Sequence, residues 1–501
     1  MNAETPPTVR GLIERQASAQ PAALYAVSTE SDRRVDYREL HDACGRVASL
    51  LLTHGCQPGE TVSLVMPNGL GTLQLLLGAL HGGWCVNPVN LLSQAEQMRY
   101  VLDHSDCTLI LASGEWVDKV RALAPRAKVL AVDHDDLQLP AQASATAAPR
   151  SEATGLLMYT SGTTGRPKGV MLTQANLAAN ALSISAEHAL TPADRVLGVL
   201  PLYHINAFAV TMLAPLASGG SVAMAPRFSA ARFWDQALQA QCTWLNVVPT
   251  MVSYLVEGKE APPREALKSI RLARSASAAL PPEHLQAFEQ RFGIGIVETM
   301  GLTETVAPAF SNPLDPAQRK LGSVGRASGC EARVIDAVLQ TLPEGETGEI
   351  VIRGPNVMRG YYKNEEATRE AFTPDGWLRT GDLGHRDADG FFFVTGRIKE
   401  LIIKGGENIA PREIDEALLR HPAVLDAAAV GVPDKHYGQE IVACVIRREG
   451  AACTAEELLE FCTRHLGRYK TPRSIHFVEE LPRGPSGKVQ RLKLVALLPA
   501  A

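Results

Sequence analysis

The stretch YTSGTTGRPKG, Tyr159 to Gly169, combines many hydrogen-bonding groups with little side-chain bulk. It contains three glycines, four serine or threonine residues, one arginine and one lysine. Glycines let backbone N–H groups come close to an anion, while hydroxyls and an ammonium group add donors and charge. A surface turn, the simpler alternative, needs only a few such residues. The stretch therefore predicts a loop that binds phosphate.

This loop differs from the common nucleotide-binding pattern G-x-x-x-x-G-K-[ST]. Counted from Gly162, Pro167 stands where that pattern has its second glycine, and Lys168 is followed by Gly169 instead of serine or threonine. The kind of phosphate chemistry must therefore be inferred from other motifs.

Composition narrows the class of protein. The 501 residues are 46% apolar and 21% charged, as in ordinary globular proteins. A net charge of −5 without a basic block argues against a nucleic-acid partner. Nine cysteines without a C-x-x-C pair suit reduced thiols in a cytoplasmic protein, so neither disulfides nor a structural metal are expected. A monomer and a homodimer are both compatible with the sequence.

No segment of the chain has the pattern of a signal peptide or a membrane span. The N-terminus lacks a basic region followed by an apolar run. The most apolar stretch, residues 207–225, is interrupted by Pro215 and by Gly219 and Gly220. It is too broken for a spanning helix, and we expect a buried helix, a turn and a strand there.

Alternation of short β-rich runs with helical stretches predicts an α/β fold. The runs at 61–67, 107–113 and 128–133 are typical of strands, and 37–55 is typical of a helix. This order favours parallel sheets covered by helices. Residues 137–153 are expected to form an exposed connector.

The composition changes after Gly390, where strand, turn and strand patterns precede a glycine pair and an amphipathic helix. About a hundred residues follow, enough for a small α+β unit. We place the boundary at Gly396 and Arg397, which gives a large domain at 1–396 and a small domain at 397–501.

Several further motifs set polar residues in apolar surroundings. They are PLYHINA (201–207), ETMGLTET (298–305), RTGDLG (379–384), GRIKELIIKGGENIAP (396–411) and LPRGPSGKVQR (481–491). Together with the phosphate loop, in this order, they resemble the adenylate-forming superfamily of acyl-CoA synthetases, peptide-synthetase adenylation domains and luciferases. The resemblance implies a large domain and a mobile small domain. It also implies an AMP-forming acid–thiol ligase, which joins a carboxylic acid to the α-phosphate of ATP and passes the acyl group to CoA.

The resemblance assigns roles to residues at the nucleotide. Glu304 would hold Mg²⁺, a cation that prefers oxygen ligands, and Thr303 would reach the α-phosphate. Asp382 would bind both ribose hydroxyls and Arg397 would complete that contact, although a turn-forming aspartate and an exposed hinge arginine are the simpler alternatives. The leaving phosphates would meet Thr160, Ser161, Gly162, Thr163, Thr164 and Lys168. The adjoining nucleotide segment is Thr299, Met300 and Gly301, with Met300 where most relatives have a tyrosine that stacks on adenine.

The small domain carries the remaining roles. The resemblance implies that Lys488 lies between the acid and the α-phosphate during adenylation, where an ammonium group offsets charge on both. Lys399 would be the hinge, and Gly405 and Gly406 would line the tunnel for the pantetheine chain of CoA. A simple turn at this glycine pair is compatible with that role.

The acid pocket implied by the resemblance is formed by His204, Asn206, Asn246, Arg274, Ser277 and Ala278. Several stretches, including RSASAAL at 274–280, are most similar to the oxalate:CoA ligase branch. A second anionic group could use Arg274 or Ser277, so we expect a short polar acid. Because the segment TVAPAF at 305–310 is apolar, a medium-chain or aromatic acid is the alternative substrate. A carrier-protein thiol is the alternative acceptor to CoA, and a non-catalytic nucleotide-binding protein is the third hypothesis.

Overall fold

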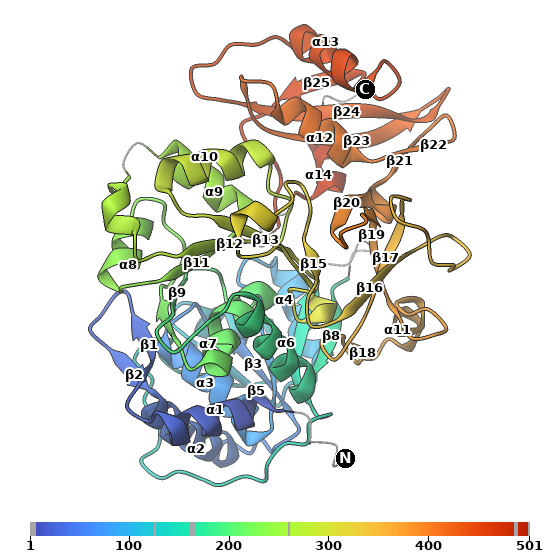
Figure 1. Cartoon of the computed structure of the whole chain (residues 1–501). Coiled ribbons are helices and arrows are strands. Elements are labelled where there is room, and N and C mark those ends of the chain that lie inside the picture. Colours follow the sequence, from blue (N-terminus) through green and yellow to red (C-terminus); the bar gives the residue numbers. More distant parts are fainter. Residues whose placement is uncertain (1–6, 125–126, 161–165, 259–260, 485–488, 499–501) are drawn as a thin grey trace.

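The computed structural model describes residues 7–124, 127–160, 166–258, 261–484 and 489–498. Figure 1 shows a large body, which contains a seven-stranded and a nine-stranded sheet with their helices. A smaller α+β unit lies at the end of the molecule opposite helices α1 and α2. The helices are α1 (Val9–Ala19), α2 (Tyr37–Thr53), α3 (Leu70–Gly82), α4 (Ala95–His104), α5 (Trp116–Leu123), α6 (Gln174–Glu187), α7 (Ala214–Ser218), α8 (Phe233–Gln239), α9 (Pro249–Glu257), α10 (Pro282–Phe292), α11 (Glu365–Glu370), α12 (Pro411–Leu419), α13 (Ala455–Leu466) and α14 (Arg491–Leu494). Shorter turns are the π-helix η1 (Ala207–Leu213) and the 3₁₀ turns η2 (Arg264–Leu267), η3 (Thr303–Thr305), η4 (Pro316–Gln318), η5 (Ile398–Glu400) and η6 (Val495–Leu497).

A seven-stranded sheet carries the phosphate loop. Its strands are β3 (Thr61–Val65), β4 (Cys85–Pro88), β5 (Leu109–Ala112), β6 (Lys128–Ala131), β7 (Thr154–Thr160), β8 (Lys168–Thr173) and β18 (Gly360–Tyr361). They lie in the order β18-β8-β7-β4-β3-β5-β6, and β7, β4, β3, β5 and β6 are parallel. The three expected strands and the helix expected at 37–55 are all present. The expected α/β class is confirmed.

A nine-stranded sheet lies beside the first and brings the acid-pocket residues together. Its strands are β1 (Leu24–Ser28), β2 (Arg34–Asp36), β9 (Arg195–Gly198), β10 (Ser221–Met224), β11 (Trp244–Val247), β12 (Leu272–Ser275), β13 (Ile296–Met300), β14 (Phe310–Ser311) and β15 (Arg326–Ala327). β11, β12 and β13 are parallel neighbours, with Asn246 beside Arg274 and Ser275 beside Glu298. Their carboxyl ends therefore meet at one edge, where ligands bind in open α/β sheets.

Local sequence explains how the first helices form. Asp36 caps α2 by accepting from the backbone of Glu39, whose side chain accepts from the Asp36 backbone in return. Every residue of α3 is buried, which matches its nearly uninterrupted apolar composition. The stretch expected to hold a buried helix, turn and strand forms η1, α7 and β10. No helix in the described part of the chain is long and apolar enough to cross a membrane.

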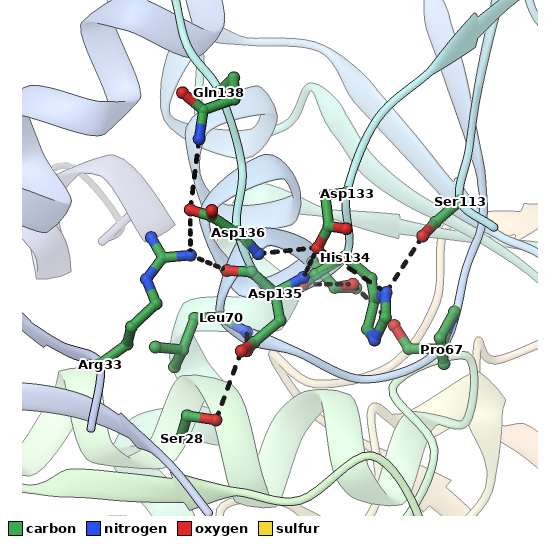
Figure 2. Close-up of polar contacts among 11 residues, drawn as sticks. Ser28, Arg33, Pro67, Leu70, Ser113, Asp133, His134, Asp135, Asp136 and Gln138 are labelled. Atoms are coloured by element: carbon green, nitrogen blue, oxygen red, sulfur yellow. Dashed lines mark hydrogen bonds and ion pairs between the residues drawn. The ribbon is translucent and has the colours of Figure 1, made fainter. Parts of the chain in front are cut away.

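The chain after β6 lies tightly over the start of α3, as Figure 2 shows. The Leu70 amide donates to Asp135 Oδ1 at 3.0 Å, and the Thr72 amide donates to the His134 carbonyl at 2.9 Å. A Cβ on Gly69 would lie 2.2 Å from that same carbonyl, so only glycine fits. The amides of Asp136 and Asp135 lower the pKa of Asp133. The residues that lead into the expected connector, 133–136, are thus fixed to the body of the protein.

The rest of the chain is mainly antiparallel. A four-stranded sheet is formed by β16 (Glu331–Ile335), β17 (Gly348–Arg353), β19 (Leu378–Arg386) and β20 (Phe392–Arg397). The small unit contains β21 (Ile402–Lys404), β22 (Glu407–Ile409), β23 (Val424–Asp434), β24 (Gly438–Arg447) and β25 (Ser474–Phe477). Buried apolar residues from Ile402 to Ile475 form a cluster of their own in this unit. The expected large domain and small α+β domain are both observed; the boundary itself, at 396 and 397, stays a prediction.

Candidate active site

The phosphate loop connects two antiparallel strands, β7 and β8. Thr160 and Lys168 are partners in that pair, so they close the base of the hairpin. Lys168 Nζ lies 4.9 Å from the centre of the Tyr361 ring. The predicted loop residues Ser161, Gly162, Thr163 and Thr164 lie outside the described residues.

Glu304 is held beside this loop base by a tyrosine. The Tyr361 hydroxyl donates to Glu304 Oε1 at 2.8 Å, and the Met358 amide donates to the Glu304 carbonyl at 2.7 Å. Burial and the Glu304 charge raise the pKa of Tyr361 well above its ordinary range, so the hydroxyl stays a donor. An oriented carboxylate next to a phosphate loop is a donor suited to Mg²⁺. The predicted metal ligand therefore fits that ion, and Thr303 precedes it in η3.

Sequence reasoning did not identify Tyr361 as a site residue. It reaches the site because β18 joins the edge of β8, with Tyr361 beside Val170. The only local signal is the pair of tyrosines after Gly360.

Asp382 and Arg397 form the second part of the site. The Arg397 Nε donates to Asp382 Oδ1 at 2.6 Å, and β19 pairs with β20 at these same two residues. Asp382 is 3% exposed. Burial alone would lower the pKa of Arg397, but the adjacent Asp382 carboxylate raises the pKa above its ordinary value. Asp382 is thus more than a turn residue, and Arg397 is a partly buried ion-pair partner, not an exposed hinge residue.

The nucleotide segment runs along the end of β13. Thr299 is buried and its Oγ1 donates to the Ser275 carbonyl at 3.4 Å. Met300 packs on a small apolar cluster that includes Phe310. A Cβ on Gly301 would lie 2.8 Å from the Cα atoms of both Ala307 and Pro308, so this turn requires glycine.

Arg274 occupies the centre of the predicted acid pocket. It is fully buried on β12. Its Nη1 donates to Asn206 Oδ1 at 2.7 Å and to Asn246 Oδ1 at 2.8 Å. In the described part of the chain, its Nε and Nη2 have no hydrogen-bond partner. Two donors of a buried guanidinium thus stay available for an anion.

Neutral amides and hydroxyls surround this arginine. Asn206 Nδ2 donates to Ser277 Oγ at 3.2 Å, and Asn246 Nδ2 donates to Thr211 Oγ1 at 3.2 Å. Burial lowers the pKa of Arg274 to about 9, so it still carries its charge at neutral pH. Asn206 directly precedes the π-helix η1, an irregular geometry that is frequent at functional sites. The result is a positive charge among polar side chains, with no ionic partner in the described part of the chain.

The remaining predicted pocket residues, His204 and Ala278, are near Asn206 and Ser277 in the sequence. His204 precedes η1; burial lowers its pKa to about 4, and its Nε2 has no hydrogen-bond partner among the described residues. It is therefore neutral at neutral pH. Ser277 has a φ of +77°, an uncommon backbone conformation for a non-glycine residue, and Ala278 follows it partly exposed.

In this structure, Gly405 and Gly406 of the small unit are not next to the predicted acid-pocket residues. Gly405 and Gly406 form an exposed tip between β21 and β22, with φ of +56° and +88°. The side chains nearest to Gly405, those of Tyr469 and Tyr437, belong to the small unit itself. The predicted hinge Lys399 is exposed in η5. Lys488 lies outside the described residues.

Lys404, which precedes this tip, was not identified from the sequence. It is buried and lies 2.6 Å from Glu440 Oε1, and its Nζ donates to the Tyr469 carbonyl at 3.1 Å. A buried ion pair cannot be inferred from a sequence motif when its members are 36 positions apart.

Comparisons with known proteins agree with this geometry. The AMP-binding enzyme profile matches residues 13–362, and the AMP-binding enzyme C-terminal domain profile matches residues 413–488. The chain belongs to the AMP-binding enzyme family. This AMP-binding enzyme is 55% identical to the sulfoacetate–CoA ligase of Cupriavidus necator over 99% of each chain. It is 36% identical to the oxalate–CoA ligase of Arabidopsis thaliana over 97% of each chain.

Among solved structures, the ATP-bound MatB from Rhodopseudomonas palustris superposes with a TM-score of 0.91 at 31% identity. The match covers 98% of this chain and 99% of that one. The expected superfamily, its fold and the class of AMP-forming acid–thiol ligases are therefore confirmed for this AMP-binding enzyme. The roles of the individual site residues stay predictions.

Proposed function

We propose that this enzyme is an acid:CoA ligase for a small carboxylic acid whose far end carries a second anionic group, such as a sulfonate or a carboxylate. It activates the acid as an acyl adenylate with ATP and Mg²⁺, releases pyrophosphate, and transfers the acyl group to CoA. The sulfoacetate and oxalate ligases among its relatives act on short, doubly anionic acids, which supports this substrate class.

The observation that carries the proposal is the buried charge of Arg274. A buried cation without a charged partner is costly unless a ligand supplies the missing charge. Its Nε and Nη2 are free donors within the described part of the chain. Together they match the planar, two-oxygen face of a carboxylate and two oxygens of a sulfonate. The second anion of the substrate would therefore complete the pocket.

The segment after Glu304 gives little support to a long or aromatic acid. Its apolar residues Val306, Ala307 and Ala309 are buried, and Val306 packs in the main core of the large body. The Val306 carbonyl also accepts from Asn180 at 2.7 Å. Core packing thus accounts for the apolar composition of residues 305–310, which was the reason to consider a medium-chain or aromatic acid as the substrate.

The residues near the nucleotide have complementary roles in this proposal. Asp382, fixed by Arg397, binds the ribose hydroxyls, and Lys168 with the loop that includes Thr160 binds the leaving phosphates. Glu304, oriented by Tyr361, would hold Mg²⁺, which when bound offsets charge on the phosphate oxygens. Domain 397–501 rotates about Lys399, presents Lys488 for adenylation, and then brings Gly405 and Gly406 to the CoA tunnel. We propose a cytoplasmic location for the enzyme.

Exchange of labelled pyrophosphate into ATP over matched acids tests the substrate class. Sulfoacetate, oxalate and malonate are compared with the singly charged acetate and butyrate, and with octanoate and phenylacetate. The doubly anionic acids should give the highest specificity constants, with AMP and pyrophosphate as products. Equal or higher values for butyrate or octanoate would contradict the proposed acid, and ADP with phosphate would contradict the ligase itself.

Substitution of Arg274 tests the pocket directly. Arg274→Met removes hydrogen bonds to a charged group, worth about 1.5 to 3 kcal/mol, so kcat/KM for the doubly anionic acid should fall by roughly 10- to 150-fold. Singly charged acids should lose much less. Arg271→Met is the matched control, because Arg271 pairs with Asp194 at 2.7 Å instead of facing the pocket. If both variants keep the parent's acid preference in correctly folded protein, Arg274 does not select the acid.

A further inference from the structure

A cluster of side chains that could hold a metal ion lies among the first three helices, apart from Glu304. Glu14 of α1, His41 of α2 and His81 of α3 each place a ligand atom within 4.8 Å of the other two. Figure 1 shows these helices gathered at the end of the molecule opposite the small unit. This cluster is separate from the nucleotide residues described above.

The observation that points to a ligand is the side chain of His81. The residue is 8% exposed, and in the described part of the chain its Nε2 has no hydrogen-bond partner. That nitrogen faces Glu14 Oε1 at 3.5 Å. A buried imidazole nitrogen left unpaired beside a carboxylate has the form of a metal ligand.

The two other side chains can adjust to an ion. The His41 ring meets the His81 ring edge-on, with centres 5.7 Å apart, and its side chain is about half exposed. The Glu14 carboxylate is also about half exposed. Ligand atoms around tetrahedral zinc are about 3.3 Å apart, so a movement on the order of 1 Å by these half-exposed side chains closes the site.

We propose that Glu14, His41 and His81 bind one divalent transition-metal ion, with zinc as the best match. Imidazole and carboxylate ligands suit zinc, which is often held by three protein ligands with water in the fourth position. The cysteine pattern predicted no structural metal, and this site uses no cysteine. By joining three successive helices, the ion stabilises the N-terminal part of the fold and takes no part in acyl transfer.

Arg10 modulates this site from one side. Its Nε lies 2.7 Å from Glu14 Oε1, and its Nη1 donates to the Thr146 carbonyl at 3.1 Å. It pairs with the Glu14 carboxylate and adds a positive charge nearby. The affinity for zinc is therefore expected in the micromolar range rather than tighter.

Calorimetric titration of chelator-treated full-length enzyme with ZnCl₂ tests the site. One equivalent should bind, and zinc in excess over its Kd should raise Tm by several degrees. His41→Ala should weaken binding more than tenfold, and because the side chain is half exposed, its removal should disturb the fold little. Co²⁺ in place of Zn²⁺ should give the visible absorption of a tetrahedral nitrogen and oxygen site, and His41→Ala should abolish that absorption.

Two controls separate this site from others. His54→Ala removes a histidine at the end of the same helix α2 and should leave zinc binding unchanged. Glu304→Gln should also leave it unchanged, which excludes the Mg²⁺ site as the source of the signal. Absence of a stoichiometric event, or equal binding by the parent and His41→Ala, would overturn the proposal.

Discussion

Glu304, the predicted ligand of Mg²⁺, has one carboxylate oxygen already occupied. The Tyr361 hydroxyl binds Oε1, and because the pKa of Tyr361 is well above its ordinary range, this hydrogen bond persists at every working pH. Side chains that fix a metal ligand tune the affinity for the metal almost as strongly as the ligand itself. Tyr361 is therefore the residue whose removal should reveal how Glu304 is positioned.

Tyr361→Phe should raise the Mg²⁺ concentration for half-maximal adenylation about tenfold, with unchanged acid preference. The reason is the loss of one charge-assisted hydrogen bond, worth about 1.5 to 3 kcal/mol, at the metal ligand. Tyr362→Phe is the matched control, since its hydroxyl binds Asp106 at 2.8 Å. The assay is pyrophosphate exchange over a Mg²⁺ series. An equal Mg²⁺ requirement in the two variants would show that Tyr361 does not position Glu304.

Among the elements, Glu298 in the middle of β13 lies within electrostatic reach of α12 of the small unit. Burial raises the pKa of Glu298 to about 7, and Arg412 and the Leu280 amide reduce the rise only in part. Glu416 of α12 also faces it and adds to the rise. An ionised Glu298 is therefore unfavourable in the folded protein.

Because the folded pKa lies above the ordinary value of 4.5, this group favours the folded state below about pH 4.5. That contribution is lost as pH rises to about 7. Relative to the parent, Glu298→Gln should gain about 2 kcal/mol of stability between pH 5 and pH 8. Thermal unfolding without ligands at both pH values measures the change. The exposed Glu283→Gln should show no such gain, and a constant difference between parent and Glu298→Gln would refute the role.

The sequence predicted elements best where a pattern is local. Strand β3 and helix α2 follow from alternation, periodicity and the Asp36 cap, all within a few residues. The buried pair of Asp382 and Arg397 was predicted in part, since each was placed at the ribose through its motif. The contact between Tyr361 and Glu304 could not be predicted, because it depends on β18 joining β8, far away in the chain. The amide cluster around Arg274 likewise joins η1, β11 and β12 only through folding.

At the scale of the whole molecule, two bodies touch through ionic contacts. Arg448 of the small unit lies 2.7 Å from Glu257 at the end of α9, and both side chains are about one-third exposed. Exposed pairs of this kind contribute roughly 0 to 1 kcal/mol. This ion pair therefore offers little resistance to the rotation that the proposed function requires.

The C-terminal motif moves with the small unit in such an exchange. Arg491, three residues after Lys488, forms an ion pair with Asp415 of α12 and another at 3.1 Å with Glu400. Its Nη1 also donates to the Ala429 carbonyl of β23 at 2.9 Å. Lys488 is thus tied in sequence to a segment fixed on the small unit, and the proposed function has it serve the large body in only one of two poses.

Lys488→Ala should therefore abolish the first half-reaction far more than the second. Loss of a preorganised charge contact at a transition state costs about 3 to 4 kcal/mol, which corresponds to a fall of hundreds of fold in adenylation. With synthetic acyl adenylate and CoA, the same variant should form thioester at nearly the parent rate. Lys493→Ala, which removes an exposed charge five residues later, should leave both rates unchanged.

Lys399→Pro should show the reverse pattern, because a fixed φ at the hinge hinders rotation but keeps the adenylating pose usable. Pyrophosphate exchange then measures the first step, and thioester formation from the adenylate measures the second. Opposite defects in these two variants require that one rotation separates the two steps. Equal losses of both steps in Lys488→Ala would mean that the lysine supports the fold or serves both poses, and the two-pose assignment would then be wrong.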